Sequence, residues 1–139
     1  CRRETAENKD LVLSLALSYG SQEEIRRCMV RIAQCVARGE LRPQDIDRQT
    51  IESHLYTAGM PPVDLMIRTS GEMRLSNFLL WQSAYAELYF TPVLWPDFTK
   101  EDFREALRAY ARRERRFGRT SDQCANDSIK HNANTNTRI

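Results

Sequence analysis

Apolar residues recur along this chain with two spacings, one typical of strands and one typical of helices. Three short apolar runs have the length and composition of buried β-strands: Leu11–Ser18, Val63–Ile67 and Ala86–Phe90. Elsewhere, apolar residues three and four positions apart predict amphipathic helices that begin near Ser21, Asp47 and Thr99. The alternation of strands with helices predicts an α/β fold with an open, mainly parallel sheet.

Residues that favour helix ends place the helix boundaries. Ser21 and Glu24 have the spacing of a capping box in which Ser21 is the N-cap. Thr99 and Asp102 have the same spacing before the last amphipathic segment. The segment Phe78–Tyr85 is predicted to be a further, short helix.

Length and composition indicate one domain and exclude several classes of protein. The chain has 139 residues and a formal net charge of +2, which is too small to require a nucleic-acid partner. No apolar run is long enough to cross a bilayer. The four cysteines form no CxxC pair, so we expect reduced thiols in a cytoplasmic protein and no zinc site. We expect residues 1–120 to be folded and the polar residues 121–139 to be a disordered tail.

Three strands make a poor sheet, because two of its edges stay bare. This is the first indication that part of the domain lies outside this chain.

The residues after the second predicted strand have the chemistry of an anion site. Arg68 ends that strand, and ligands of open α/β sheets bind at the carboxyl ends of strands. Thr69–Gly71 is expected to form a tight turn with free backbone N–H groups. Arg74 and Ser76 follow, and a helix is expected to start near Asn77. Guanidinium groups, a hydroxyl and a helix N-terminus favour phosphate or diphosphate.

Each of these charged residues also has a purely structural interpretation. Arg68 and Arg74 could pair with Asp64 and Glu72 as a network of ion pairs. Glu87 lies in an apolar and aromatic run, where a carboxylate is costly unless it is paired or binds a metal. Beside a diphosphate the expected metal is Mg²⁺, and the alternative is a salt bridge to an arginine.

The stretch Ile67–Phe98 (IRTSGEMRLSNFLLWQSAYAELYFTPVLWPDF) resembles the carboxy-terminal signature of the cis-prenyltransferases, the family of undecaprenyl diphosphate synthase. Leu15–Gly20 (LALSYG) and Arg113–Gly118 (RERRFG) fit the same family. The resemblance implies a three-layer fold with an open, mainly parallel sheet and flanking helices, of which this chain is an N-terminally truncated portion.

The resemblance also implies an activity and a site. The family condenses isopentenyl diphosphate with an allylic diphosphate such as farnesyl diphosphate, in cis configuration, to a long-chain polyprenyl diphosphate. The product would be the undecaprenyl precursor of the carrier lipid for cell-wall peptidoglycan. By resemblance, Arg68, Arg74, Leu75 and Ser76 bind isopentenyl diphosphate, and Glu87 binds Mg²⁺. The family further implies a cytoplasmic homodimer, with peripheral membrane contact for release of the lipid product.

Two departures from the family pattern limit what this chain is expected to do alone. The motif Asp-Gly-Asn-x-Arg-Trp, which supplies the family's catalytic aspartate, has no counterpart here. We therefore expect no catalytic residue in the chain and no activity from it alone. Met73 stands where some members have a histidine, so no metal-binding role is assigned to it.

Two other functions are alternatives to the enzyme. One is a non-catalytic accessory subunit, which usually lacks the diphosphate-binding residues that this chain keeps. The other is nucleic-acid binding by the arginine-rich end of the last helix, which has no aromatic stacking platform.

Overall fold

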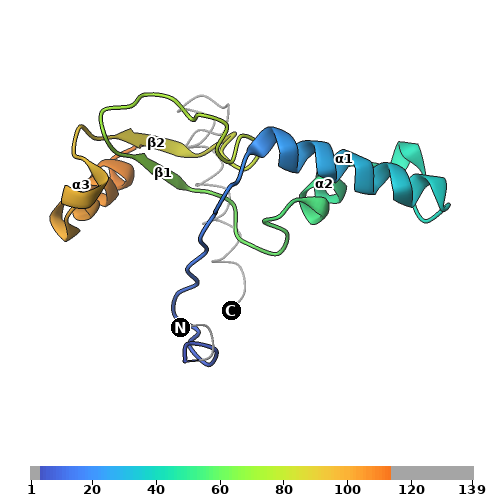
Figure 1. Ribbon diagram of the computed structural model, residues 1–139, viewed down its shortest axis with the longest axis horizontal. Coiled ribbons are helices and arrows are strands. Elements are labelled where there is room, and N and C mark those ends of the chain that lie inside the picture. Colours follow the sequence, from blue (N-terminus) through green and yellow to red (C-terminus); the bar gives the residue numbers. More distant parts are fainter. Residues whose placement is uncertain (1–3, 114–139) are drawn as a thin grey trace, which may run out of the picture. The chain divides into compact units, whose positions relative to one another are not determined.

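The computed structural model describes residues 4–113, which form two compact units. The first unit contains the described residues up to Met60 together with Ser76–Leu80, and the second contains Pro61–Leu75 and those from Trp81 onward. The first unit holds helices α1 (Ser21–Ala37) and α2 (Arg48–His54) and the 3-10 turn Pro43–Asp45. The second holds β1 (Leu65–Arg68), β2 (Glu87–Phe90), α3 (Lys100–Ala111) and the 3-10 turn Trp95–Asp97 (Figure 1). Among residues 4–113, no helix has the length and apolar character needed to cross a bilayer.

The two strands form a parallel ladder, which confirms the predicted α/β class with a parallel sheet. In its register Leu65 lies opposite Glu87, and Arg68 lies opposite Phe90. Residues 69–86 connect the two strands without forming a regular helix. Helix α3 contacts β2, and its Ala106 is completely buried. Two of the three predicted strands are therefore present, each displaced by no more than two residues.

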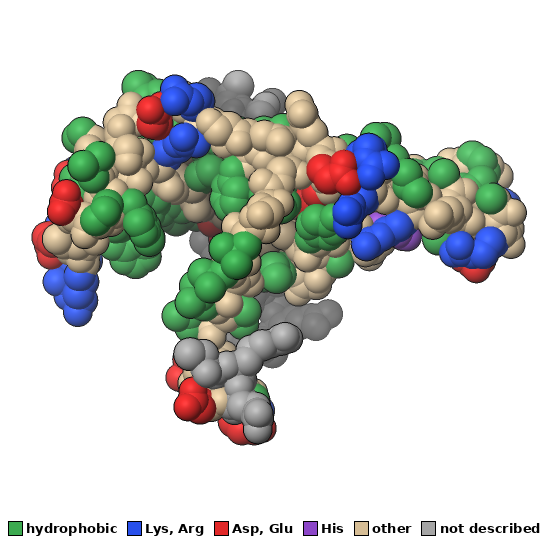
Figure 2. All heavy atoms as spheres, viewed as in Figure 1, with side chains coloured by type: hydrophobic (Ala, Val, Ile, Leu, Met, Phe, Trp, Pro, Cys, Tyr) green, Lys and Arg blue, Asp and Glu red, His purple; other side chains and the backbone are tan. Residues whose placement is uncertain are grey.

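The predicted strand Leu11–Ser18 is wrong. This segment has an irregular backbone, and its large apolar side chains are exposed, from 77% at Leu15 to 84% at Leu17. Figure 2 shows hydrophobic side chains gathered in a column along this segment. A strand needs a neighbour to pair its backbone N–H and C=O groups, and none of the described residues pairs with this segment. An apolar composition without a partner strand is insufficient to form sheet.

The predicted helix Phe78–Tyr85 is also wrong. The segment consists of turns and bends, and Leu79 has a left-handed φ of 46°, which a right-handed helix does not contain. The Leu80 backbone N–H donates to Ser21 Oγ at 3.0 Å instead of to a helical carbonyl. The tertiary contact with Ser21 therefore replaces the local helical bond.

The first helix begins differently from its prediction, whereas the other two begin as predicted. Gly20 is the N-cap of α1 and has no side chain that could cap the helix. Ser21, the predicted N-cap, is the first residue of the helix and is fully buried. The caps of α2 and α3 are confirmed. Asp47 Oδ1 accepts the Thr50 N–H at 2.7 Å, and this bond lowers the pKa of the Asp47 carboxyl. Thr99 at the start of α3 forms the expected capping box.

A buried carboxylate connects the two helices of the first unit. Glu24 on α1 is 1% exposed, and its Oε1 accepts the backbone N–H of Tyr56, just after α2, at 2.7 Å. The Tyr19 hydroxyl donates to Glu24 Oε2. Burial, together with this bond to a carboxylate, raises the pKa of Tyr19 to about 12. The neighbouring Leu55 is 3% exposed, so the network lies beside the core of this unit.

Replacing Glu24 tests this network. In Glu24→Ala the Tyr56 N–H loses its acceptor, and hydrogen bonds to charged groups contribute about 1.5–3 kcal/mol each. We expect the free energy of unfolding, measured by urea denaturation, to fall by about 2–3 kcal/mol. The matched control is Glu23→Ala, because Glu23 bonds only to exposed arginines of α1 such as Arg26. Equal losses in the two variants would contradict a special role for Glu24.

Candidate functional site

The turn after β1 is fastened to the segment after β2 by three backbone hydrogen bonds. The Arg68 carbonyl accepts the Thr91 N–H at 2.9 Å, which extends the ladder by one step. The Ser70 N–H donates to the Val93 carbonyl at 2.8 Å, and the Gly71 N–H donates to the Thr91 carbonyl at 2.9 Å. The prediction that this turn offers free N–H groups is therefore wrong at Ser70 and Gly71. These two N–H groups are therefore not offered to an anion.

Arg68 remains a candidate for binding an anion. Arg68 is half-buried at the carboxyl end of β1 and forms no ion pair with any residue that the structure describes. The predicted alternative, an ion pair with Asp64, is not formed within residues 4–113. The Asp64 carbonyl instead accepts the Glu87 N–H at 2.9 Å. A half-buried arginine without a carboxylate partner among the described residues favours an anionic ligand.

The other predicted diphosphate ligands lie in different surroundings. Arg74 is exposed and forms the expected ion pair with Glu72, and its diphosphate-binding role stays a prediction. Leu75 is half-buried and ends this segment of the second unit. Ser76 is exposed, belongs to the first unit, and has a left-handed φ of 48°. The second unit therefore holds Arg68, Arg74 and Leu75.

Glu87 forms the salt bridge that was the alternative to a metal site. Its Oε2 accepts from Arg113 Nη1 at 2.8 Å, and the same nitrogen donates to the Leu88 carbonyl at 2.8 Å. The Glu87 side chain is 24% exposed. The role of Arg113 was not foreseen, although it opens the RERRFG motif and follows α3, the helix that contacts β2.

The sheet does not bring Arg68 and Glu87 together. Arg68 ends β1 and Glu87 begins β2, so they stand three steps apart along the ladder, a separation of about 10 Å. Side chains alternate between the faces of a sheet, which places these two on opposite faces. A single ion cannot bridge both residues in this arrangement.

The described residues could supply one carboxylate to a magnesium site, but not a complete set of ligands. No group of three or more His, Cys, Asp or Glu side chains within residues 4–113 has the arrangement of a metal site. Glu87 retains Oε1 outside its bond to Arg113. One carboxylate oxygen is compatible with Mg²⁺, which keeps several waters and often shares its site with phosphate oxygens.

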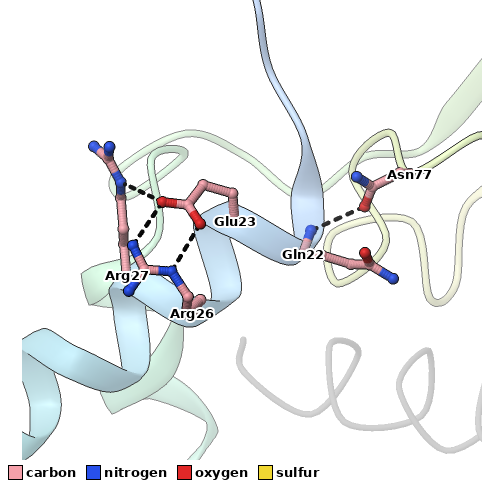
Figure 3. Close-up of polar contacts among 5 residues, drawn as sticks. All are labelled: Gln22, Glu23, Arg26, Arg27 and Asn77. Atoms are coloured by element: carbon pink, nitrogen blue, oxygen red, sulfur yellow. Dashed lines mark hydrogen bonds and ion pairs between the residues drawn. The ribbon is translucent and has the colours of Figure 1, made fainter.

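Asn77 has a structural role that the sequence did not suggest. Its carbonyl accepts the Ser21 N–H at 2.8 Å, and its Oδ1 accepts the Gln22 N–H at 2.9 Å (Figure 3). The expectation that Asn77 starts an anion-binding helix is wrong, because it caps α1 instead. The residue type could have suggested this role, because asparagine is favoured both at helix N-caps and in left-handed backbone conformations.

Comparisons with known proteins agree with the sequence motifs. Residues 1–118 match the family model described as "Putative undecaprenyl diphosphate synthase". The isoprenyl transferase of Geobacillus kaustophilus is 57% identical over 119 residues, which are 86% of this chain and 46% of that protein. A Vibrio cholerae relative, the farnesyl-diphosphate-specific ditrans,polycis-undecaprenyl-diphosphate synthase, is 50% identical over 86% of this chain and 48% of its own.

Solved structures resemble the chain as well. Lavandulyl diphosphate synthase from Lavandula x intermedia, in complex with dimethylallyl diphosphate, superimposes with a TM-score of 0.72 at 50% identity. That match covers 75% of this chain and 45% of the synthase. A probable undecaprenyl diphosphate synthase from Campylobacter jejuni gives a TM-score of 0.68 at 36% identity, over 84% of this chain and 52% of its own.

The chain spans about half the length of the curated relatives that it matches. Since the family model covers residues 1–118 of 139, and since the motifs and the parallel sheet agree with it, the chain belongs to the undecaprenyl diphosphate synthase family of prenyltransferases.

Proposed function

We propose that this chain is part of a cis-prenyltransferase that condenses isopentenyl diphosphate with an allylic diphosphate such as farnesyl diphosphate. The product is a long-chain polyprenyl diphosphate, the undecaprenyl precursor of the cell-wall carrier lipid. The observation that carries the proposal is that Arg68, a half-buried residue at the end of a parallel strand, has no carboxylate partner among residues 4–113. Membership of the family and the substrate named for the Vibrio cholerae relative support it.

In this proposal the chain's own residues hold the nucleophile. Arg68 and Arg74 form charge-assisted bonds to the diphosphate of isopentenyl diphosphate, and the Ser76 hydroxyl adds a hydrogen bond. Leu75 contributes to the same binding segment. The alkene then attacks the allylic carbon, so that a carbon–carbon bond forms and the carbon–oxygen bond to the leaving diphosphate breaks. Loss of a proton leaves a cis double bond, and the residues contribute by positioning.

We propose a role for Glu87 as one ligand of Mg²⁺. A bound magnesium ion would neutralise negative charge on diphosphate oxygens. The Arg113 guanidinium holds Glu87 Oε2, and Oε1 is the atom offered to the ion. Because residues 4–113 contain no group of three or more potential metal ligands, the remaining ligands come from substrate oxygens, water or residues outside 4–113. A homodimer, a cytoplasmic location and membrane contact for product release complete the proposal.

The Arg74 assignment can be tested by binding. In Arg74→Ala of the complete gene product, loss of a charge-assisted bond should raise the Kd for isopentenyl diphosphate about tenfold or more. Affinity for the allylic diphosphate should change much less, and both are measured by isothermal titration calorimetry. Arg42→Ala is the matched control, because Arg42 is also exposed and paired with a nearby acid, Asp45. An unchanged Kd in Arg74→Ala would refute the assignment.

The Glu87 assignment can be tested by metal binding without an activity measurement. Manganese(II) serves as the probe, and electron paramagnetic resonance gives its Kd in the presence of isopentenyl diphosphate. Glu87→Gln should weaken Mn²⁺ binding about tenfold, because the substitution removes the negative charge of the ligand. Glu101→Gln is the control, since Glu101 is likewise paired with arginines. Equal Mn²⁺ affinity in wild type and Glu87→Gln would remove Glu87 from the metal site.

The 139-residue chain by itself is expected to lack prenyltransferase activity, because it carries no Asp-Gly-Asn-x-Arg-Trp motif and spans about half the length of its relatives. The assay supplies farnesyl diphosphate, labelled isopentenyl diphosphate and Mg²⁺, with the Geobacillus kaustophilus isoprenyl transferase as positive control. Labelled long-chain product from the chain alone would contradict this expectation. Stimulation of a second, catalytic chain without turnover of its own would favour the alternative, an accessory subunit.

A further inference from the structure

The N-terminus of α1 is capped from a distant part of the chain. The first backbone N–H groups of a helix have no helical partner and need acceptors from elsewhere. Asn77 supplies two of them, its carbonyl oxygen to the Ser21 N–H at 2.8 Å and its Oδ1 to the Gln22 N–H at 2.9 Å (Figure 3). A residue 55 positions away thus does the work that the sequence pattern assigned to Ser21.

Further contacts hold the loop Ser76–Leu80 against the residues at the start of α1. Ser21 is fully buried, and its Oγ accepts the Leu80 N–H at 3.0 Å. The Phe78 ring lies edge-on to the Tyr19 ring, with their centroids 5.5 Å apart. Three of the five residues of the short loop Ser76–Leu80 are therefore fixed to Tyr19 or to the start of α1.

The backbone of this loop would not keep its conformation without those contacts. Ser76, Asn77 and Leu79 have φ angles of 48°, 62° and 46°, all in the left-handed region. Residues with a side chain pay a conformational cost there, which asparagine tolerates better than serine or leucine. Such conformations persist where surrounding structure imposes them. The bonds of Asn77 to α1 are the direct constraint on its neighbour Ser76.

Gly20 leaves the room that Asn77 needs. A Cβ atom built on Gly20 would lie 2.9 Å from Asn77 Nδ2, closer than real Cβ contacts allow. The φ of Gly20 is −149°, an extended value open to any residue, so a side chain here would disturb the Asn77 amide and not the backbone of Gly20.

We infer that Asn77 is a positioning residue that sets the Ser76 hydroxyl for the diphosphate of isopentenyl diphosphate. Asn77 itself makes its bonds to α1, and it acts on the substrate only through Ser76. The inference rests on the proposed function, in which Ser76 binds that diphosphate. Gly20 belongs to the same device, because it lets the Asn77 amide approach the helix N-terminus.

The test is a double-mutant cycle in the complete gene product, with the Kd for isopentenyl diphosphate as readout. Ser76→Ala and Asn77→Ala should each raise that Kd about fivefold, the factor expected for one hydrogen bond. The double variant should be no weaker than Ser76→Ala alone, because Asn77 has no other route to the ligand. The Kd for the allylic diphosphate should stay unchanged in all three.

Two further variants separate positioning from general stability. Asp47→Ala removes the cap of α2 and should cost similar stability while leaving the Kd for isopentenyl diphosphate unchanged. Gly20→Ala should reproduce the Kd of Asn77→Ala, and it should have no further effect when combined with Asn77→Ala, which removes the clashing amide. If Asn77→Ala does not fold, Asn77→Gly, which suits a φ of 62°, takes its place in the cycle.

The outcomes distinguish this inference from the proposed function. An unchanged Kd in Ser76→Ala refutes the binding role of Ser76, and with it the premise. A raised Kd in Ser76→Ala with an unchanged Kd in Asn77→Ala overturns the positioning role alone. Additive effects of the two substitutions overturn it as well, because Asn77 would then act independently of Ser76.

Discussion

The parallel pairing of β1 with β2 is the constraint on which the second unit depends. The ladder continues past its last residue pair, since the Arg68 carbonyl accepts the Thr91 N–H, and the turn then folds back through the N–H groups of Ser70 and Gly71. The N–H groups of Ser70 and Gly71, which could otherwise bind an anion, are thereby used to fix the strand end. Arg68, the proposed anion ligand, stands on a backbone that hydrogen bonds hold in place.

The register of the two strands also separates the diphosphate site predicted at Arg68 from the metal site predicted at Glu87. Opposite ends and opposite faces of a four-residue ladder keep Glu87 away from Arg68, and Glu87 is held by Arg113 instead. A carboxylate in an apolar strand needs a partner, and an arginine that also bonds the next carbonyl satisfies it. Magnesium binding at Glu87 and diphosphate binding at Arg68 can therefore be tested by separate substitutions.

Sequence reasoning succeeded where local interactions decide the structure. Asp47 and Thr99 cap helices through residues three positions away, and the strand around Leu65–Arg68 is recognisable from its composition. It failed where a distant contact outweighs the local one. The spacing of Ser21 and Glu24 fits a capping box, yet Asn77 caps α1 and Glu24 is bound by Tyr56. Leu11–Ser18 has the composition of a strand but no partner strand among the described residues.

The same difference between local and distant interactions applies to the candidate site. The types of residue predicted an anion site, and the neighbour Glu72 was foreseen as a partner of Arg74, whereas Arg113 lies 26 positions from Glu87 and was not. These partners set how strongly each group can bind a ligand. The exposed pair of Arg74 and Glu72 is a weak one, so in the proposed complex a diphosphate would take the place of Glu72 at little cost. Arg68 has no ion pair to break among residues 4–113 and is half-buried, so in the same complex its charge-assisted bond would contribute more of the affinity.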